Sequence, residues 1–182
     1  MSAPGTSLRI ALPDLAATAR LAAAAAALAR RGDAILLEGP LGAGKTAWAR
    51  AFLRAAAGDP TLEVPSPTFT LVQSYDTRLG PVHHFDLWRL DGPAALDELG
   101  WDEACDDIVL VEWPDRLGPL RPADALTVVL ALGRGEPETS GSGSGGAQRS
   151  IPGLAAPPVA DAGDDARHAV VSGWPDRIGR LA

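Results

Sequence analysis

Short apolar runs alternate along the chain with amphipathic segments, and this alternation predicts strands separated by helices. Residues 34–37 and 108–111 are entirely apolar, which is typical of strands buried on both faces of a parallel sheet. Further strands are predicted over residues 70–75, 82–88 and 126–132. We therefore expect an α/β fold in three layers, with a central sheet that is mostly parallel but mixed.

Three segments have the composition and the ends of helices. The first helix is expected to follow the N-cap residue Asp14 and to end before Gly32. The second is predicted over residues 45–57, where the large apolar side chains fall on one stripe, and the third over residues 93–99. Two prolines within residues 65–69 exclude a helix, so we expect an extended loop there.

The composition changes after the last predicted strand, and this change sets the expected domain organisation. We expect one ordered catalytic domain over residues 1–133. Residues 134–150 include a run of serine and glycine that cannot bury apolar surface, so we interpret them as a flexible linker or insertion. Residues 151–182 are expected to be a weakly ordered extension. Its last part, 170–182, either returns to the domain as an edge element or stays loose.

One short sequence occurs twice. Residues 113–118 read WPDRLG, and residues 174–179 read WPDRIG. The first copy follows Glu112, whereas the second follows Gly173 and so lacks a preceding acid that could carry chemistry. Because the flanking sequences do not match, we favour chance resemblance over a domain repeat.

Composition and charge narrow the possible functions. The net charge of -7 argues against tight, self-sufficient nucleic-acid binding, because affinity for phosphate backbones comes mainly from Lys and Arg. The single cysteine, Cys105, excludes an internal disulfide and fits a reducing compartment. Neighbouring His83 and His84 would point to opposite faces of a strand and cannot chelate one ion, so zinc is not expected. The reducing compartment that we expect is the cytoplasm. No apolar segment has membrane-spanning length, so we expect no membrane contact.

The strongest motif lies between a predicted strand and a predicted helix. Residues 39–46 read GPLGAGKT, which fits G-x-x-x-x-G-K-[ST] in the context that confirms a phosphate-binding P-loop. We expect Lys45 to reach the β- and γ-phosphates of a nucleoside triphosphate and the Thr46 hydroxyl to bind Mg²⁺. The fold is thus predicted to be that of a P-loop NTPase. The residues expected to contact the nucleotide are Gly39, Leu41, Gly42, Ala43, Gly44, Lys45 and Thr46.

Hydrolysis also needs a carboxylate beside the metal and a group that orients the attacking water. Two acids are candidates. Glu112 directly follows the apolar run 108–111, at the end of a core strand, and Asp86 lies in or at the end of another strand. From the pattern alone we assign Glu112 as the acid on the metal side. For each acid taken singly, a solvated strand-end carboxylate is an equally good interpretation.

Four segments in order resemble the TsaE family, also called YjeE, the small P-loop ATPases of bacterial tRNA threonylcarbamoyladenosine biosynthesis. The resemblance spans roughly residues 12–132. It implies ATP and Mg²⁺ as cofactors, TsaB and TsaD homologues as partners, and contact with tRNA only through that complex. The matching segments are LEGPLGAGKT at 37–46, SPTF at 66–69, HFDLWRL at 84–90 and EWPDR at 112–116.

The resemblance also implies roles for individual residues. Asp86 would support Mg²⁺, while Glu112 would act on the water or on the metal through water, which reverses the assignment from the pattern alone. Thr68 lies in a segment that resembles a switch loop and would sense the γ-phosphate or the metal. The implied catalytic residues are Lys45, Glu112 and Thr68, and the implied metal-binding residues are Thr46, Asp86 and Glu112.

Two other functions use the same P-loop. A small-molecule kinase would pass the γ-phosphate to a metabolite, but such kinases usually have a lid that carries arginines, and residues 58–80 contain only Arg78. A binding switch without hydrolysis is disfavoured because both Asp86 and Glu112 are present. The function that the resemblance implies is ATP hydrolysis that resets the TsaB–TsaD complex between turnovers.

Overall fold

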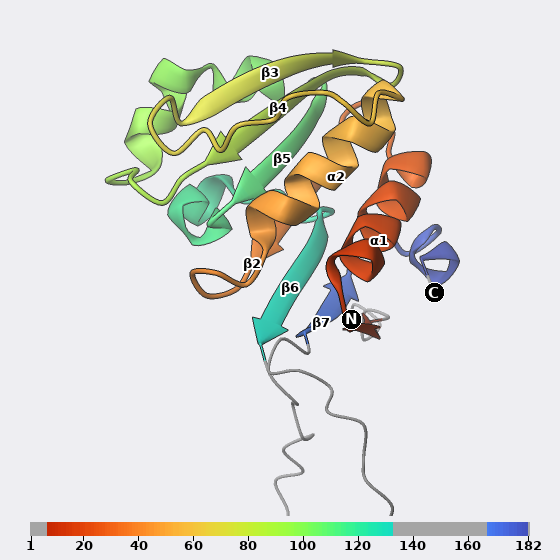
Figure 1. The fold of residues 1–182 in the computed structure, drawn as a ribbon. Helices are drawn as coiled ribbons and strands as arrows, with labels where there is room; N and C mark the ends of the chain where they lie inside the picture. The colour runs from red at the N-terminus through yellow and green to blue at the C-terminus, as the bar shows by residue number, and fades with distance from the viewer. Residues whose placement is uncertain (1–6, 133–166, 182) are drawn as a thin grey trace, which may run out of the picture.

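The computed structural model describes residues 7–132 and 167–181, whose strands form one mixed sheet (Figure 1). The strand order across the sheet is β1-β7-β6-β2-β5-β4-β3. β4, β5, β2 and β6 run parallel to their neighbours in this group, and the outer pairs are antiparallel. This arrangement confirms the predicted α/β fold class. The strands are β1 (Ser7–Leu12), β2 (Ala34–Glu38), β3 (Val72–Thr77), β4 (Gly80–Asp86), β5 (Ile108–Glu112), β6 (Leu126–Leu132) and β7 (Arg167–Ser172).

Helices cover both faces of the sheet and complete the three layers (Figure 1). α1 (Leu15–Leu28) and α2 (Lys45–Ala57) pack on one face together with side chains such as Ile35 and Leu37. The alternate side chains of β2, including Leu36, face the other layer. That layer contains α3 (Trp101–Ala104) and two 3₁₀ helices, η1 (Pro93–Leu99) and η2 (Pro114–Leu120).

The helix ends follow the predicted capping chemistry, with one change of helix type. Asp14 is the N-cap of α1, and its carboxylate accepts a hydrogen bond of 2.6 Å from the backbone N–H of Ala17. Residues 93–99 form the 3₁₀ helix η1 rather than an α-helix.

None of the helices in the described part of the chain has the length and apolar character needed to cross a bilayer.

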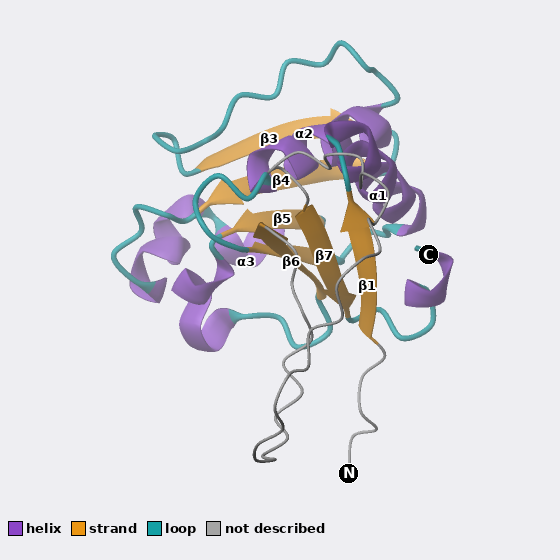
Figure 2. Ribbon diagram, turned by 60° about the horizontal axis from the view of Figure 1, so that its bottom comes forward, coloured by secondary structure: helices purple, strands orange, loops and turns teal. Residues whose placement is uncertain are grey.

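The antiparallel side of the sheet differs from the sequence prediction (Figure 2). The sequence predicts either an edge element or a loose end for residues 170–182. In the structure, β7 begins at Arg167 and lies inside the sheet, between β6 and β1. The edge position was wrong because β1, which the sequence did not predict, takes the outer place. The sheet therefore extends beyond the expected domain of residues 1–133. Residues 133–166, which contain the predicted linker 134–150, lie outside the described residues.

The parallel strands bring the candidate acids to one edge of the sheet. In the register of β4 and β5, the Cα atoms of Asp86 and Glu112 are direct partners, and Glu112 is also the partner of Leu37 at the end of β2. The P-loop leaves β2 one residue after Glu38, so it starts at the same edge. Carboxyl ends of parallel strands are where ligands of open α/β sheets bind.

Candidate functional site

The P-loop connects β2 to the N-terminus of α2 and packs closely against the neighbouring strand. Gly39 has φ 133°, and a Cβ at this position would lie 2.3 Å from the carbonyl oxygen of Leu130. Glycine is therefore required there both by conformation and by space. Gly44 is the N-cap residue of α2, and the helix begins at Lys45. The free N–H groups and the positive dipole end of this helix face the loop, which suits an anion.

Lys45 is buried at the centre of the site. Its ammonium group donates hydrogen bonds of 2.7 Å and 2.8 Å to the carbonyl oxygens of Gly39 and Pro40. The same nitrogen lies 3.7 Å from the ring centroid of Trp113, a cation–π contact. Burial lowers the pKa of Lys45, and the nearby carboxylates of Glu112 and Asp86 oppose this shift. The site thus holds one cationic side chain among acceptors and an aromatic face.

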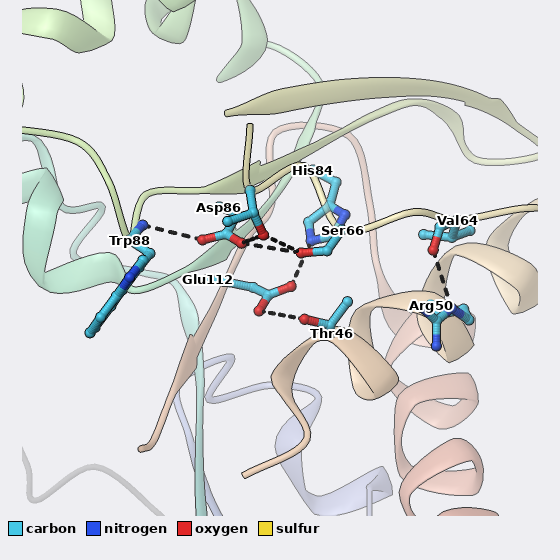
Figure 3. Close-up of polar contacts among 9 residues, drawn as sticks. Thr46, Arg50, Val64, Ser66, His84, Asp86, Trp88 and Glu112 are labelled. Carbon is cyan, nitrogen blue, oxygen red and sulfur yellow. Dashed lines mark hydrogen bonds and ion pairs between the residues drawn. The ribbon is translucent and has the colours of Figure 1, made fainter. Parts of the chain in front are cut away.

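Glu112 is the last residue of β5, and each of its two carboxylate oxygens has a hydrogen-bond partner (Figure 3). Its Oε2 accepts a hydrogen bond of 3.0 Å from the Thr46 hydroxyl, and its Oε1 lies 3.0 Å from Nε2 of His84. The residue is 2% exposed. This carboxylate therefore connects the P-loop helix α2 to strand β4, and it lies beside the hydroxyl predicted to bind Mg²⁺.

Asp86 ends β4 and holds the loop that follows α2 (Figure 3). Its Oδ2 accepts hydrogen bonds from the hydroxyls of Thr68, at 2.8 Å, and Ser66, at 3.2 Å. Its Oδ1 accepts a bond of 3.2 Å from the backbone N–H of Trp88. The proposed switch segment is thus bound directly to one of the two acids.

A pocket of about 300 Å³ joins these groups. It collects most of the residues predicted from the sequence, but Gly39 and Ala43 do not line it. Gly39 instead packs against Leu130, and Ala43 is buried in the core. The lining residues are Leu41, Gly42, Gly44, Lys45, Thr46, Ala47, Ser66, Thr68, Asp86, Trp88, Glu112 and Trp113.

The oxygen donors that line the pocket fit magnesium in their chemistry. Thr46, Asp86 and Glu112 supply a hydroxyl and two carboxylates, and oxygen is the ligand atom that Mg²⁺ prefers. Within residues 7–132 and 167–181, no group of three or more His, Cys, Asp and Glu side chains could hold a metal ion by itself. Mg²⁺ commonly uses one or two carboxylates together with substrate phosphates, so two acids beside a P-loop are enough.

Two residues of this region were missed in the sequence. Arg167, at the start of β7, places a guanidinium nitrogen 3.2 Å from where a Cβ on Gly44 would lie, and it lines a second pocket of about 280 Å³ formed with residues 12–15. No motif pointed to it. His84 was noted only as a poor metal ligand, although its spacing of two residues from Asp86 places both side chains on one face of β4.

Comparisons with known proteins identify similar chains. The model of the family described as "Threonylcarbamoyl adenosine biosynthesis protein TsaE" matches residues 12–137. Two proteins named tRNA threonylcarbamoyladenosine biosynthesis protein TsaE are similar. The one from Rickettsia bellii is 37% identical over 63% of this chain and 80% of its own. The one from Bacillus subtilis is 35% identical over 62% and 70%. The crystal structure of Bacillus subtilis YdiB has a TM-score of 0.67 at 25% identity, covering 99% of this chain and 94% of that one.

Proposed function

We propose that this chain, which belongs to the TsaE family of threonylcarbamoyl adenosine biosynthesis proteins, is a Mg²⁺-dependent ATPase of the tRNA N6-threonylcarbamoyladenosine modification machinery. One observation carries the ATPase assignment. The buried carboxylate of Glu112 is hydrogen-bonded to Thr46 of the P-loop and lies in register with Asp86. A phosphate cradle and two acids at one sheet edge are the parts that phosphoryl transfer to water requires.

The P-loop residues 39–46 would hold the phosphates of ATP through backbone N–H groups and the N-terminus of α2. Lys45 would exchange its hydrogen bonds to the loop carbonyls for bonds to phosphate oxygens. Its contact with Trp113 keeps the ammonium group next to the pocket. Lys45 thereby neutralises part of the charge on the transferring phosphoryl group.

Thr46, Asp86 and Glu112 would hold Mg²⁺, which when bound supplies positive charge to the β- and γ-phosphate oxygens. Glu112 would also orient the attacking water, because its carboxylate is fixed between α2 and β4. Asp86 would keep Thr68 close to the γ-phosphate through their 2.8 Å hydrogen bond. In this assignment both Asp86 and Glu112 would bind the metal, and only Glu112 would also orient the attacking water.

The second pocket would take the nucleoside end of ATP. It is lined by residues 12–15 and Arg167, and a guanidinium nitrogen of Arg167 lies 3.2 Å from where a Cβ on Gly44 would be. A guanidinium group beside the phosphate loop suits a phosphate or ribose oxygen, because it donates in a fixed fork.

TsaB and TsaD homologues are the proposed partners, and tRNA would be contacted only through them. The net charge of -7 agrees with leaving the RNA to the partner proteins. Two large apolar side chains are exposed in this region: Leu41, which lines the pocket, is 77% exposed, and Phe69, next in sequence to the lining residue Thr68, is 83% exposed. Such side chains are typical of protein interfaces. ATP hydrolysis would reset the TsaB–TsaD complex between turnovers, and the cytoplasm is the proposed location.

Phosphate release from ATP tests this function, measured with and without the TsaB and TsaD homologues and tRNA. We expect low release from the chain alone and strong stimulation by the complete set. The Lys45→Ala chain is the control and should remove the stimulated release. Phosphate that appears on a small metabolite instead of in solution would favour the kinase and overturn the proposal.

A further inference from the structure

We propose that His84 is a positioning residue that orients Glu112 for its action on the attacking water. The inference rests on the proposed function, because it takes Glu112 as the group that directs the water. His84 is 0% exposed, and its Nε2 lies 3.0 Å from Oε1 of Glu112 (Figure 3). The other carboxylate oxygen is bound to Thr46. Glu112 is thus held by one group from β4 and one from α2.

The hydrogen bond has a defined direction. An ionised carboxylate can only accept, so Nε2 of His84 carries the proton and donates it. The other ring nitrogen, Nδ1, is buried and has no hydrogen-bond partner among the described residues. Within the described structure, the only polar bond of this side chain is therefore the one to Glu112.

The strand register explains how His84 reaches this carboxylate. His84 and Asp86 lie two residues apart on β4 and face the same side of the sheet. Glu112 is the direct Cα partner of Asp86, while His84 is paired with Leu110, so His84 reaches Glu112 diagonally. A glutamate side chain has three rotatable bonds, and the bond to Thr46 alone leaves the plane of the carboxylate free to turn. The second bond removes that freedom.

A purely structural role is the competing explanation, since buried polar pairs also occur away from active sites. Two amide substitutions separate the explanations. In His84→Gln the side-chain nitrogen can reach about the position of Nε2, whereas in His84→Asn it stops near Nδ1, one methylene shorter. Both are polar and uncharged, so they form a matched pair that differs mainly in reach.

The readouts are kcat for stimulated phosphate release, the Kd for ATP, and the crystal structure of each variant. We expect His84→Asn to lower kcat by roughly 10- to 100-fold, the usual effect of losing a group that orients a site ligand, with Kd changed by less than about 3-fold. His84→Gln should stay within about 3-fold of the wild type in kcat. In the His84→Asn crystal structure the Glu112 carboxylate should be turned away from its present orientation. Equal losses in kcat for both substitutions, or no loss for either, would overturn the proposal.

A double-mutant cycle with Glu112→Gln shows whether His84 acts through that residue. Adding His84→Asn to Glu112→Gln should lower the residual kcat by less than about 2-fold, since residues that act as a unit are not additive. A further loss as large as in the wild-type background would overturn the proposal. Wild-type hydrolysis by Glu112→Gln alone would instead reject the role of Glu112 in the proposed function.

Folding of the variants is checked by thermal unfolding. If His84→Asn does not fold, His84→Gln decides alone. A crystal structure with its amide bound to Glu112, together with near-wild-type kcat, supports positioning. The same structure with kcat lowered more than about 10-fold contradicts it.

Discussion

Residues 113–118 and 174–179 have nearly the same sequence, and both begin with the same kind of turn. Each copy follows closely on a strand, β5 or β7, and each begins with a tryptophan at positive φ, 62° for Trp113 and 43° for Trp174. In each copy the backbone N–H of the arginine donates to the carbonyl of that tryptophan, at 3.2 Å and 2.8 Å. The first four residues of the two copies therefore form a similar turn, whereas the copies differ at their ends, where Gly118 has φ 53° and Gly179 does not have a positive φ.

The surroundings of the two copies differ completely. Trp113 follows Glu112 and has the ammonium group of Lys45 over its ring. Trp174 is 2% exposed, and the group over its ring is Arg177, whose guanidinium also binds Asp33 at 2.6 Å. The first copy contributes to the proposed nucleotide site, and the second binds Asp33, directly before β2, through Arg177. The preceding residue and the residues outside the repeat that each copy contacts, Lys45 for the first and Asp33 for the second, decide the role.

The largest expected effect comes from the partner that gives the first copy its role. Lys45→Ala removes the buried cation above Trp113, and we expect a loss of about 4 kcal/mol in ATP binding, roughly 1,000-fold in Kd. Calorimetric titration with Mg–ATP measures it. The substituted chain should still fold, as checked by circular dichroism. A Kd for ATP within about 10-fold of the wild-type value would show that Lys45, whose ammonium group lies over Trp113, does not bind the phosphates.

Gly173, the residue before the second copy, is a glycine for a purely structural reason. Gly173 has φ 97°, and a Cβ there would lie 2.1 Å from the carbonyl oxygen of Ala125, so neither glutamate nor any other side chain fits. Gly173→Ala should lower the free energy of unfolding by about 3 kcal/mol through clash and strain. Gly179→Ala is the control in the same copy, since a Cβ there meets nothing within 4 Å. Denaturant unfolding compares them, and equal stabilities would contradict this explanation.

The residue before the first copy should matter for chemistry instead. Glu112→Gln keeps the size of the side chain and removes its charge, and we expect kcat for ATP hydrolysis to fall about 100-fold while ATP binding persists. Asp115→Asn, an exposed acid of the same copy, is the control and should change kcat by less than about 2-fold. If the two substitutions have the same effect on phosphate release, Glu112 has no special role.

The smallest effect is expected at the arginines of the two copies. Arg177 binds Asp33 through both terminal nitrogens and also donates to the carbonyl of Leu28, with the ion-pair side chains only 12% and 14% exposed. Arg177→Ala should cost about 2 kcal/mol of stability. The exposed Arg116 of the first copy is its match, and Arg116→Ala should cost less than about 0.5 kcal/mol. Urea unfolding that ranks them in the opposite order would reject the assignment of Arg177 as a structural clamp.

The sequence predicted the parallel half of the fold because its signals are local. The fully apolar runs predicted β2 and β5, and the P-loop motif between a strand and a helix predicted the phosphate-binding loop. The antiparallel side formed by β1 and β7 was missed, since both strands mix polar and apolar residues and lack the fully apolar runs of β2 and β5. Arg167 beside Gly44 depends on that strand pairing, so no local pattern could reveal it. The bonds that connect His84, Glu112 and Thr46 likewise depend on the register between strands.

The central claim is that the P-loop binds the phosphates of ATP, and the reactivity of Lys45 tests it most directly. Lys45 is the only lysine in the chain, so an amine-acylating reagent has one ε-amino target, which peptide mass spectrometry separates from the α-amine. Because burial lowers the pKa of Lys45, the reactive neutral amine should form at lower pH than on an exposed lysine. Glu112→Gln should move the labelling curve lower still, since the Glu112 carboxylate raises that pKa. At ten times the Kd, Mg–ATP should slow labelling of Lys45 about 10-fold, and unchanged labelling at saturating Mg–ATP would contradict the account.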